Sequence, residues 1–504
     1  MAMTRRPGPC AAARRRPTPQ RQLAPLCAPL LALALGACAV GPDYHTPDLP
    51  VPPSWSGKGA ATRQAPPELA EWWRRLSDPL LNRLVDEAVA GNLSVAAAKA
   101  RVREARASLD QAVGGLFPTV DGYGSAQRLQ NGDARPAGNV IARTQAQWEI
   151  DLFGANLRAA EAARYGLDAA QEELRNTLLV LIGDVAASYV EARGLQARLA
   201  VARRTVQSQR ESEALTRARL SAGGATALDV ANAAAQTAST EAAIPALETS
   251  LAQTVHRLSV LTGRPPAALA GLMQKPAPIP APRWPVRVGV PADILLTRPD
   301  VRQAERAYAA ATARIGEATA ALYPSVSLTG NIATSAARLG DLGRSSTISW
   351  VFGPSLTVPV FNAGRLHAAV KMAEARRDQE FAALQSTVLS ALEEVENAIV
   401  TLNQEGTRIR SLEAAVRNSL EALRLSRDLY QSGNVSFLEV LTAERSAFSS
   451  QNSLIEARVS RALAWIRLNK ALGGGWSGVI DASRPLVTDR NTGPHFVKTP
   501  ELRP

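Results

Sequence analysis

The chain contains two similar halves, and this duplication restricts its fold more than any other feature of the sequence. The segment "RLSAGGATALDV" matches "LYQSGNVSFLEV", so that Gly223 falls on Gly433, and other motifs repeat at a similar offset. The halves cover about residues 93–263 and 299–473, with a linker at 264–298 between them. Because internal repeats fold into one supersecondary unit each, we expect the same unit to occur twice.

Each half contains two segments in which apolar and polar residues alternate, a pattern typical of β-strands. In "TISWVFGPSLTVPVF" the alternation places Ile348, Trp350 and Phe352 on one face and Ser349 and Gly353 on the other. Polar loops join the two segments of each half. The predicted strands cover residues 117–128 and 140–153 in the first repeat and residues 322–335 and 347–361 in the second.

Helical periodicity surrounds these strands. A helix opens each repeat, and a long helix follows the strands at 155–221 and at 365–431, where apolar residues step by threes and fours as in a coiled coil. Each long helix ends at a glycine suited to a C-terminal cap, and a return helix follows at 225–262 and at 435–472. The long helices should extend about 100 Å. They carry charges throughout, so they are expected in an aqueous compartment and not in the bilayer.

Four amphipathic strands are too few to form a membrane barrel. Known membrane barrels begin at about eight strands, and an open sheet edge in lipid leaves backbone groups without hydrogen-bond partners. Several copies of the chain must therefore pool their strands, and three copies with twelve strands are the simplest solution. The expected assembly is a tube whose barrel lies in a membrane and whose helices extend into the neighbouring aqueous space.

Residues 1–37 have the layout of a bacterial signal peptide. Six arginines and no acidic residue precede an apolar run that ends in "LGAC" at Cys38. This ending resembles the lipoprotein box, which implies cleavage before Cys38 and attachment of a diacylglyceryl group and an N-acyl chain, such as palmitate, to that residue. Two or more acyl chains form a stable anchor. The alternative is an ordinary signal peptide whose small residues happen to precede a cysteine.

The order of the motifs resembles the TolC-like outer-membrane factors of tripartite efflux systems, and within them the lipidated NodT-type branch. The matching pieces are "LGACAVGPDY", "WWRRLSDPLLNRLVDEAVAGN", "TRPDVRQAE", the two strand starts at Phe-Pro and Tyr-Pro, and the two glycine turns. The resemblance implies a mainly α-helical fold with membrane β-strands. Three chains would form a twelve-stranded outer-membrane β-barrel continuous with a twelve-helix periplasmic α-barrel, docked through a periplasmic adaptor to an inner-membrane pump of the resistance-nodulation-division type.

The same resemblance indicates functional residues at the periplasmic tips. Asp229 and Glu439 each lie six residues after a turn glycine and match acidic positions at the family's channel constriction, and Tyr430 matches a position that helps to hold the closed end. Gly223 and Gly433 would present the turns to the adaptor. Rings of carboxylates favour cations. The alternative is structural, because an acidic residue in the first turn of a helix also complements the helix dipole, and glycine also caps helices.

Other functional classes find little support in the sequence. The four histidines are isolated, and no phosphate-binding loop or nucleophile motif occurs, so we expect neither an enzyme nor a metal cofactor. The signal arginines account for half of the net charge of +12, and no basic block with aromatic residues indicates nucleic-acid binding. The predicted function is passive export of drugs or other toxic small molecules across the outer membrane. Metal-ion efflux, type I secretion and a periplasmic structural or adaptor lipoprotein remain alternatives.

Two flanking regions complete the expected organisation. Residues 38–92 should hold the N-terminal anchor segment and equatorial helices, and the tail at 474–504 shows no periodicity and is expected to be extended or disordered. No energy source is visible in the chain, so direction and drive are expected to come from the inner-membrane partner, and the sequence does not identify the cargo.

Overall fold

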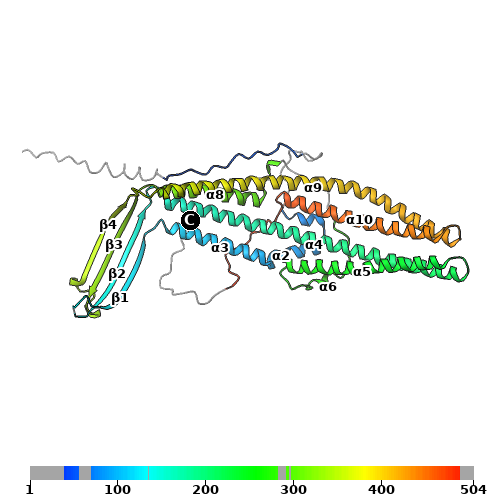
Figure 1. Cartoon of the computed structure of the whole chain (residues 1–504), viewed down its shortest axis with the longest axis horizontal. Helices are drawn as coiled ribbons and strands as arrows, with labels where there is room; N and C mark the ends of the chain where they lie inside the picture. The colour runs from blue at the N-terminus through cyan, green and yellow to red at the C-terminus, as the bar shows by residue number, and fades with distance from the viewer. Residues whose placement is uncertain (1–38, 56–69, 134, 282–290, 294–296, 488–504) are drawn as a thin grey trace, which may run out of the picture.

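The computed structural model describes residues 39–55, 70–133, 135–281, 291–293 and 297–487. A small antiparallel sheet forms one end of the elongated chain, and a bundle of long helices extends from it to two hairpin tips at the other end (Figure 1). Cys38 and the signal peptide lie outside the described residues, as does the last part of the tail from residue 488.

Two helical hairpins, one per repeat, account for most of the length. Helix α4 (Ala155–Ser221) leads through a tight turn into α5 (Ala227–Leu261), and α9 (Arg365–Gln431) leads into α10 (Phe437–Ala471). Both long helices contain 67 residues, which corresponds to about 100 Å. The shorter elements are η1 (Trp72–Leu76), α2 (Pro79–Gly91), α3 (Leu93–Gly114), α6 (Ala270–Met273), η2 (Pro291–Asp293), α8 (Pro299–Ala320), η3 (Leu339–Asp341) and η4 (Ser345–Thr347).

The sheet combines the strands of both repeats. Strands β1 (Thr119–Leu129), β2 (Ala137–Ile150), β3 (Ser325–Ala336) and β4 (Ile348–Thr357) lie in the order β1-β2-β3-β4, and every neighbouring pair is antiparallel. The β2–β3 pairing therefore joins the two halves of the chain. Within the described residues, β1 and β4 form the two edges of the sheet and each has one strand neighbour.

The first and third strands begin later than the predicted starts at 117 and 322. The N–H of Phe117 donates to the carbonyl of Gly114, and that of Tyr323 donates to Ala320, so both residues close the preceding helix. The prolines that follow them have no N–H to contribute to the sheet. The strands start only after these prolines, at Thr119 and Ser325.

The second and fourth strands end earlier than the predicted ends at 153 and 361. Strand β2 ends at Ile150, because the N–H of Leu152 bonds back to the Ile150 carbonyl at 2.8 Å. Strand β4 ends at Thr357, two residues before Pro359, which cannot donate to a ladder. The return helices also begin two residues later than the predicted 225 and 435, at Ala227 and Phe437.

The hydrophobic core is concentrated at the middle of the chain, where three distant segments meet. Trp72, Trp73 and Trp465 are fully buried, and the rings of Trp72 and Trp465 pack edge-to-face at 5.5 Å. Trp73 stacks on Trp476 of the tail, and the indole N–H of Trp72 donates to the carbonyl of Gly474 at 3.1 Å. The described tail to residue 487 forms no helix or strand but is held against this core.

Two leucines of α5 offer a matched test of where the stability of the chain resides. Leu258 is completely buried, whereas Leu228 near the tip is 69% exposed. We expect Leu258→Ala to lower the free energy of unfolding by about 2–5 kcal/mol, because it removes packed methyl groups and leaves a cavity. Leu228→Ala should change it by less than about 0.5 kcal/mol. Denaturant unfolding followed by helical circular dichroism measures both, and equal effects would contradict the burial pattern.

Candidate functional site: the sheet faces and the helical tips

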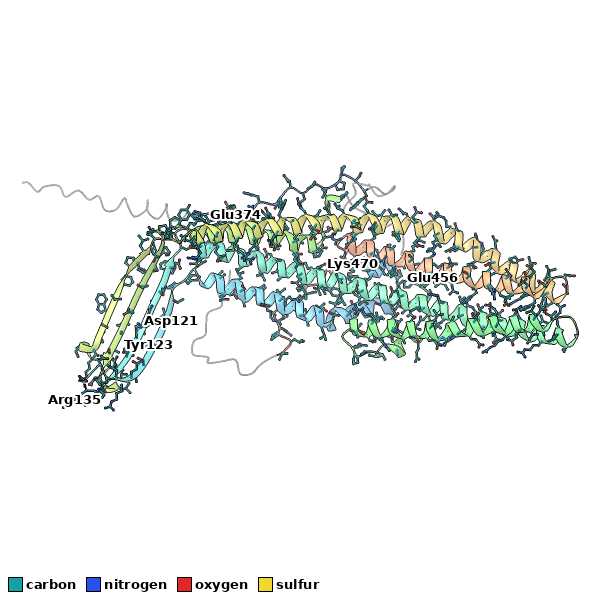
Figure 2. All side chains as sticks on the ribbon, in the orientation of Figure 1. Asp121, Tyr123, Arg135, Glu374, Glu456 and Lys470 are labelled. Atoms are coloured by element: carbon teal, nitrogen blue, oxygen red, sulfur yellow. The ribbon has the colours of Figure 1, made fainter. Side chains whose placement is uncertain are left out.

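The two faces of the sheet differ in polarity. Residues that pair across antiparallel strands share a face, so the register places Tyr123, Arg143, Ala333 and Ser349 in one row. The same face carries further polar residues: Thr119, Asp121, Ser125, Gln127, Asn139, Gln145, Gln147, Glu149, Ser327, Thr329, Asn331, Ser335 and Ser355. Figure 2 locates Asp121 and Tyr123 on β1. The Arg143 guanidinium lies over the Tyr123 ring at 5.3 Å.

The opposite face is open and mainly apolar, with Arg128, Thr144 and Thr334 as its polar residues. It carries Val120, Gly122, Gly124, Ala126, Val140, Ala142, Ala146, Trp148, Ile150, Val326, Leu328, Gly330, Ile332, Ile348, Trp350, Phe352 and Leu356. Trp350 is 75% exposed in the single chain, and Phe352 and Leu356 are similarly uncovered. An exposed apolar surface of this kind indicates contact with lipid or with another protein.

The helical tips are closed by the same backbone motif in both repeats. Gly223 and Gly433 adopt left-handed conformations with φ of +75° and +81°. The N–H of Gly224 donates to the carbonyl of Arg219 at 2.7 Å, and that of Asn434 donates to Leu429 at 2.9 Å. These bonds across five residues are the signature of a Schellman cap. Both glycines therefore cap helices and shape compact exposed turns.

The two predicted constriction acids lie beside these turns, where Asp229 is half-buried and Glu439 is exposed. Asp229 and Thr226 cap the N-terminus of α5 with a capping box. The Asp229 carboxylate accepts from the Thr226 N–H at 2.9 Å, and the Thr226 hydroxyl accepts from the Asp229 N–H at 3.2 Å. Glu439 occupies the equivalent position in α10, where Ser436 makes no side-chain capping bond. Asp229 thus has a local structural role, and Glu439 is not bound in a capping box of this kind.

Tyr430 is buried and connects the two hairpins. It is 5% exposed, its hydroxyl donates to Thr216 Oγ1 of α4 at 3.3 Å, and its ring packs edge-to-face on Phe437. The Arg219 guanidinium lies 4.5 Å from the Tyr430 ring centre and donates to the Tyr430 carbonyl. Tyr430 therefore lies inside the contact between the hairpins in the single chain.

Arg219 was not identified from the sequence. It is one cation among many on a charged helix, and it acquires a role only because α9 ends beside it. One signal was available: the repeat equivalent of Arg219 is Leu429, and the equivalent of Tyr430 is Leu220. Comparing the repeats for positions where they differ would have indicated both members of this contact.

A second connection between the hairpins lies further from the tips and was also missed. Glu444 of α10 is only 3% exposed, and its carboxylate accepts from Arg427 of α9 at 2.6 Å and from the hydroxyl of Ser212 of α4 at 2.8 Å. A buried charge requires such partners. In their outer half the hairpins are therefore joined by polar contacts as well as by the small apolar cluster around Tyr430 and Phe437, and the larger apolar core lies at the middle of the chain.

The described chain starts at the junction between the sheet and the helices. The N–H of Val40 donates to the Phe153 carbonyl at 3.1 Å, and Arg158 of α4 forms an ion pair with Asp43 at 2.7 Å. The hydrogen bond and charge of Arg158 hold the pKa of Asp43 below its usual range. Gly154 contacts Ala39 so closely that a Cβ would lie 2.9 Å from the Ala39 Cα. Residues 39–43 are thus fixed to the base of the sheet.

In the described part of the chain, no group of three or more His, Cys, Asp and Glu side chains is arranged to hold a metal ion. None of the helices in that part is both long enough and apolar enough to cross a bilayer.

Comparison with known proteins identifies the family. The family model described as outer membrane efflux protein matches residues 84–264 and 290–474. The chain belongs to this family. Nodulation protein T of Rhizobium leguminosarum bv. trifolii is 35% identical over 464 residues, which cover 90% of this chain and 98% of the relative. Outer membrane protein OprJ of Pseudomonas aeruginosa is 33% identical over 92% of this chain and 97% of its own.

Solved structures of the family have the same fold. The outer-membrane channel OprN superimposes with a TM-score of 0.81 at 33% identity, covering 87% of this chain and all of that one. A CusC structure gives a TM-score of 0.77 at 30% identity over 86% of this chain and all of its own. The predicted family and fold are therefore confirmed. The chain is an outer-membrane efflux channel component with its helices in the periplasm and its sheet in the outer membrane.

The turn glycines can be tested against a glycine of ordinary helical conformation. Gly223 has positive φ, and we expect Gly223→Ala to destabilise the hairpin by about 1–2 kcal/mol because a Cβ is strained there. Gly166 lies inside α4, and nothing lies within 4 Å of an added Cβ. Gly166→Ala should therefore stabilise by about 0.5–1 kcal/mol. Thermal unfolding of both variants measures the effects, and effects of the same sign would exclude the proposed conformational origin.

Proposed function

We propose that three copies of this chain form one passive export channel without enzymatic activity. The single observation that carries the proposal is the sorting of the sheet into a polar and an apolar face, with one strand neighbour each for β1 and β4. Pairing β4 of one copy with β1 of the next supplies the missing hydrogen bonds. Twelve strands then enclose a polar lumen and present the apolar face to lipid.

The channel works with a periplasmic adaptor and an inner-membrane pump of the resistance-nodulation-division type. This part of the proposal rests on the family and on the two compact exposed turns at Gly223 and Gly433, which are available for the adaptor at the helical tips. Energy and cargo selection come from the pump. The proposed cargo is drugs or other toxic small molecules, in line with relatives named as a solvent efflux pump and a toluene efflux pump outer membrane protein.

Metal-ion efflux is a second candidate, because the CusC relatives are named cation efflux system proteins and are 32% identical to this chain. Those relatives match 90% of this chain, as Nodulation protein T does, so the shared length does not favour metal ions over other cargo. Type I secretion remains a further alternative within the same channel architecture.

The tip residues are assigned different roles in this proposal. Asp229 is half-buried and Glu439 is exposed, and in a trimer they supply six carboxylates at the narrow end of the channel. Tyr430 acts from inside the chain, where with Arg219 it holds the two hairpin tips together. Cys38 carries the lipid anchor, and the attachment of Ala39 beside Gly154 supports a position for that anchor at the base of the sheet.

Removing the tip charges should change ion selectivity. Asp229→Asn combined with Glu439→Gln retains hydrogen-bonding groups of the same shape while removing two negative charges per chain. We expect a lower cation preference in planar bilayers, because carboxylate rings concentrate cations at a pore entrance. Asp86→Asn on α2 is the matched control, since Asp86 is exposed and far from the tips. An unchanged reversal potential in the double variant would leave Asp229 with its capping role alone and would contradict a constriction role for Glu439.

Export itself is tested in a deletion strain. We expect loss of the gene to increase sensitivity to at least one amphiphilic drug, dye, solvent or metal, and the intact gene to restore growth. A broad panel without any change, together with normal protein secretion, would contradict the efflux function. A metal-only phenotype would favour the cation alternative.

The role of the lipid is tested by supplying the deletion strain with the Cys38→Ser variant. The outer membrane of this strain should contain less channel than that of a strain with the intact gene, and an unchanged amount would argue against a role for the lipid.

A further inference from the structure

The end of the sheet far from the helices carries a group of arginines, which we call the basic rim: Arg128, Arg135 and Arg338. Arg128 lies near the end of β1, Arg135 follows in the β1–β2 loop, and Arg338 follows β3. Figure 2 labels Arg135 at this extremity of the molecule. All three side chains are exposed. Because the helices lie in the periplasm, the basic rim faces the cell exterior.

The arginines of the basic rim differ from their neighbour in having no intramolecular partner. Arg344 of the same region forms an ion pair with Asp341 at 2.9 Å. Among the described residues, the side chains of Arg128, Arg135 and Arg338 form no hydrogen bond or ion pair. With Asp341 already paired, Asp133 is left as the other acidic residue of these loops. The rim therefore carries an excess of positive charge with free donor groups.

The basic rim lies at the outer end of the apolar face of the sheet. Arg128 continues the row of Val120, Gly122, Gly124 and Ala126, so it ends the apolar face of β1 at the outer edge of the sheet. Arg128 pairs with Gly138, and Trp148 lies about ten residues further along β2, near the helices. About ten residues correspond to about 33 Å along a strand. With the usual tilt this gives about 25 Å, the height of the apolar band of outer-membrane barrels.

The two ends of this apolar band therefore carry groups suited to the two membrane boundaries. At the inner end, the exposed ring of Trp148 donates its N–H to the Leu116 carbonyl at 3.0 Å, as expected of an aromatic residue at a membrane interface. At the outer end, Arg128 occupies the depth of the lipid headgroups. Arginine donates several N–H groups in a planar fork and binds phosphate oxygens in pairs.

We propose that the basic rim binds the phosphate groups of anionic glycolipid in the outer leaflet of the outer membrane. The contact holds the outer end of the sheet at a defined depth, as the lipid at Cys38 would do at the inner end. An alternative role would be attraction of anionic cargo at the channel exit. The position of Arg128 on the lipid-facing row, and not on the polar row with Arg143, favours the lipid.

The test measures lipid binding by the full-length channel in detergent. The probe is lipid A, a bis-phosphorylated glucosamine disaccharide, titrated in native mass spectrometry against the wild type and the Arg128→Ser/Arg135→Ser/Arg338→Ser variant. Each arginine near an anionic surface contributes about five-fold in affinity, so the triple variant should bind about a hundred-fold more weakly. An affinity within about two-fold of the wild type would overturn the proposal.

Three controls make the result specific. Arg204→Ser/Arg376→Ser/Arg417→Ser removes the same charge from exposed helical positions and should leave lipid A binding unchanged, whereas an equal loss would indicate a mere net-charge effect. The same triple change to lysine keeps the charge and should restore most of the affinity, which excludes misfolding as the cause. Dephosphorylated lipid A should bind the wild type as weakly as intact lipid A binds the serine variant. Equal binding of both lipids would assign recognition to the acyl chains and contradict the proposal.

Discussion

The structure of this chain depends on one constraint: a four-stranded sheet lies in lipid, and the outward-facing backbone N–H and C=O groups of its two edge strands lack hydrogen-bond partners within the described chain. Strands β1 and β4 each have one strand neighbour within the described chain, and one face of the sheet is apolar and open. A lipid environment offers no donors or acceptors to a free strand edge. The chain is therefore incomplete alone, and the other features, from the long helices to the tip contacts, belong to one segment of a larger closed tube.

The duplicated architecture is maintained by backbone chemistry that both repeats share. Each long helix ends at a glycine of positive φ, and each return helix does so as well, at Gly263 and Gly473. In all four cases the next N–H bonds back across five residues. The two hairpins also match in length, with long helices of 67 residues and return helices of 35 residues. Such regularity allows two hairpins from each of several copies to fit into one cylinder.

The polar contacts that join the hairpins near the tips occur where the repeats are not the same. Arg219 and Tyr430 meet across the hairpins, whereas their repeat equivalents, Leu429 and Leu220, are both leucine. Glu444 likewise accepts from Arg427 and Ser212. These polar contacts lie in the outer half beside a small apolar cluster around Tyr430 and Phe437, while the large core with the buried tryptophans lies at the middle. The hairpins therefore share a smaller apolar cluster in the outer half than at the middle of the chain.

The duplication, the four strands, the two hairpins and the position of the turns can all be predicted from the sequence, because periodicity and glycine are local signals. The sequence predicts the ends of the strands less accurately. Phe117 and Tyr323 can belong either to a strand or to the end of the preceding helix, and only the hydrogen bonds of the folded chain select the helix. The tertiary structure alone decided the partners of Tyr430, Arg219 and Glu444, and the free state of the arginines at the outer end of the sheet. These depend on which helices and loops meet far apart in the sequence, and a charge on a helix surface gives no indication of its partner.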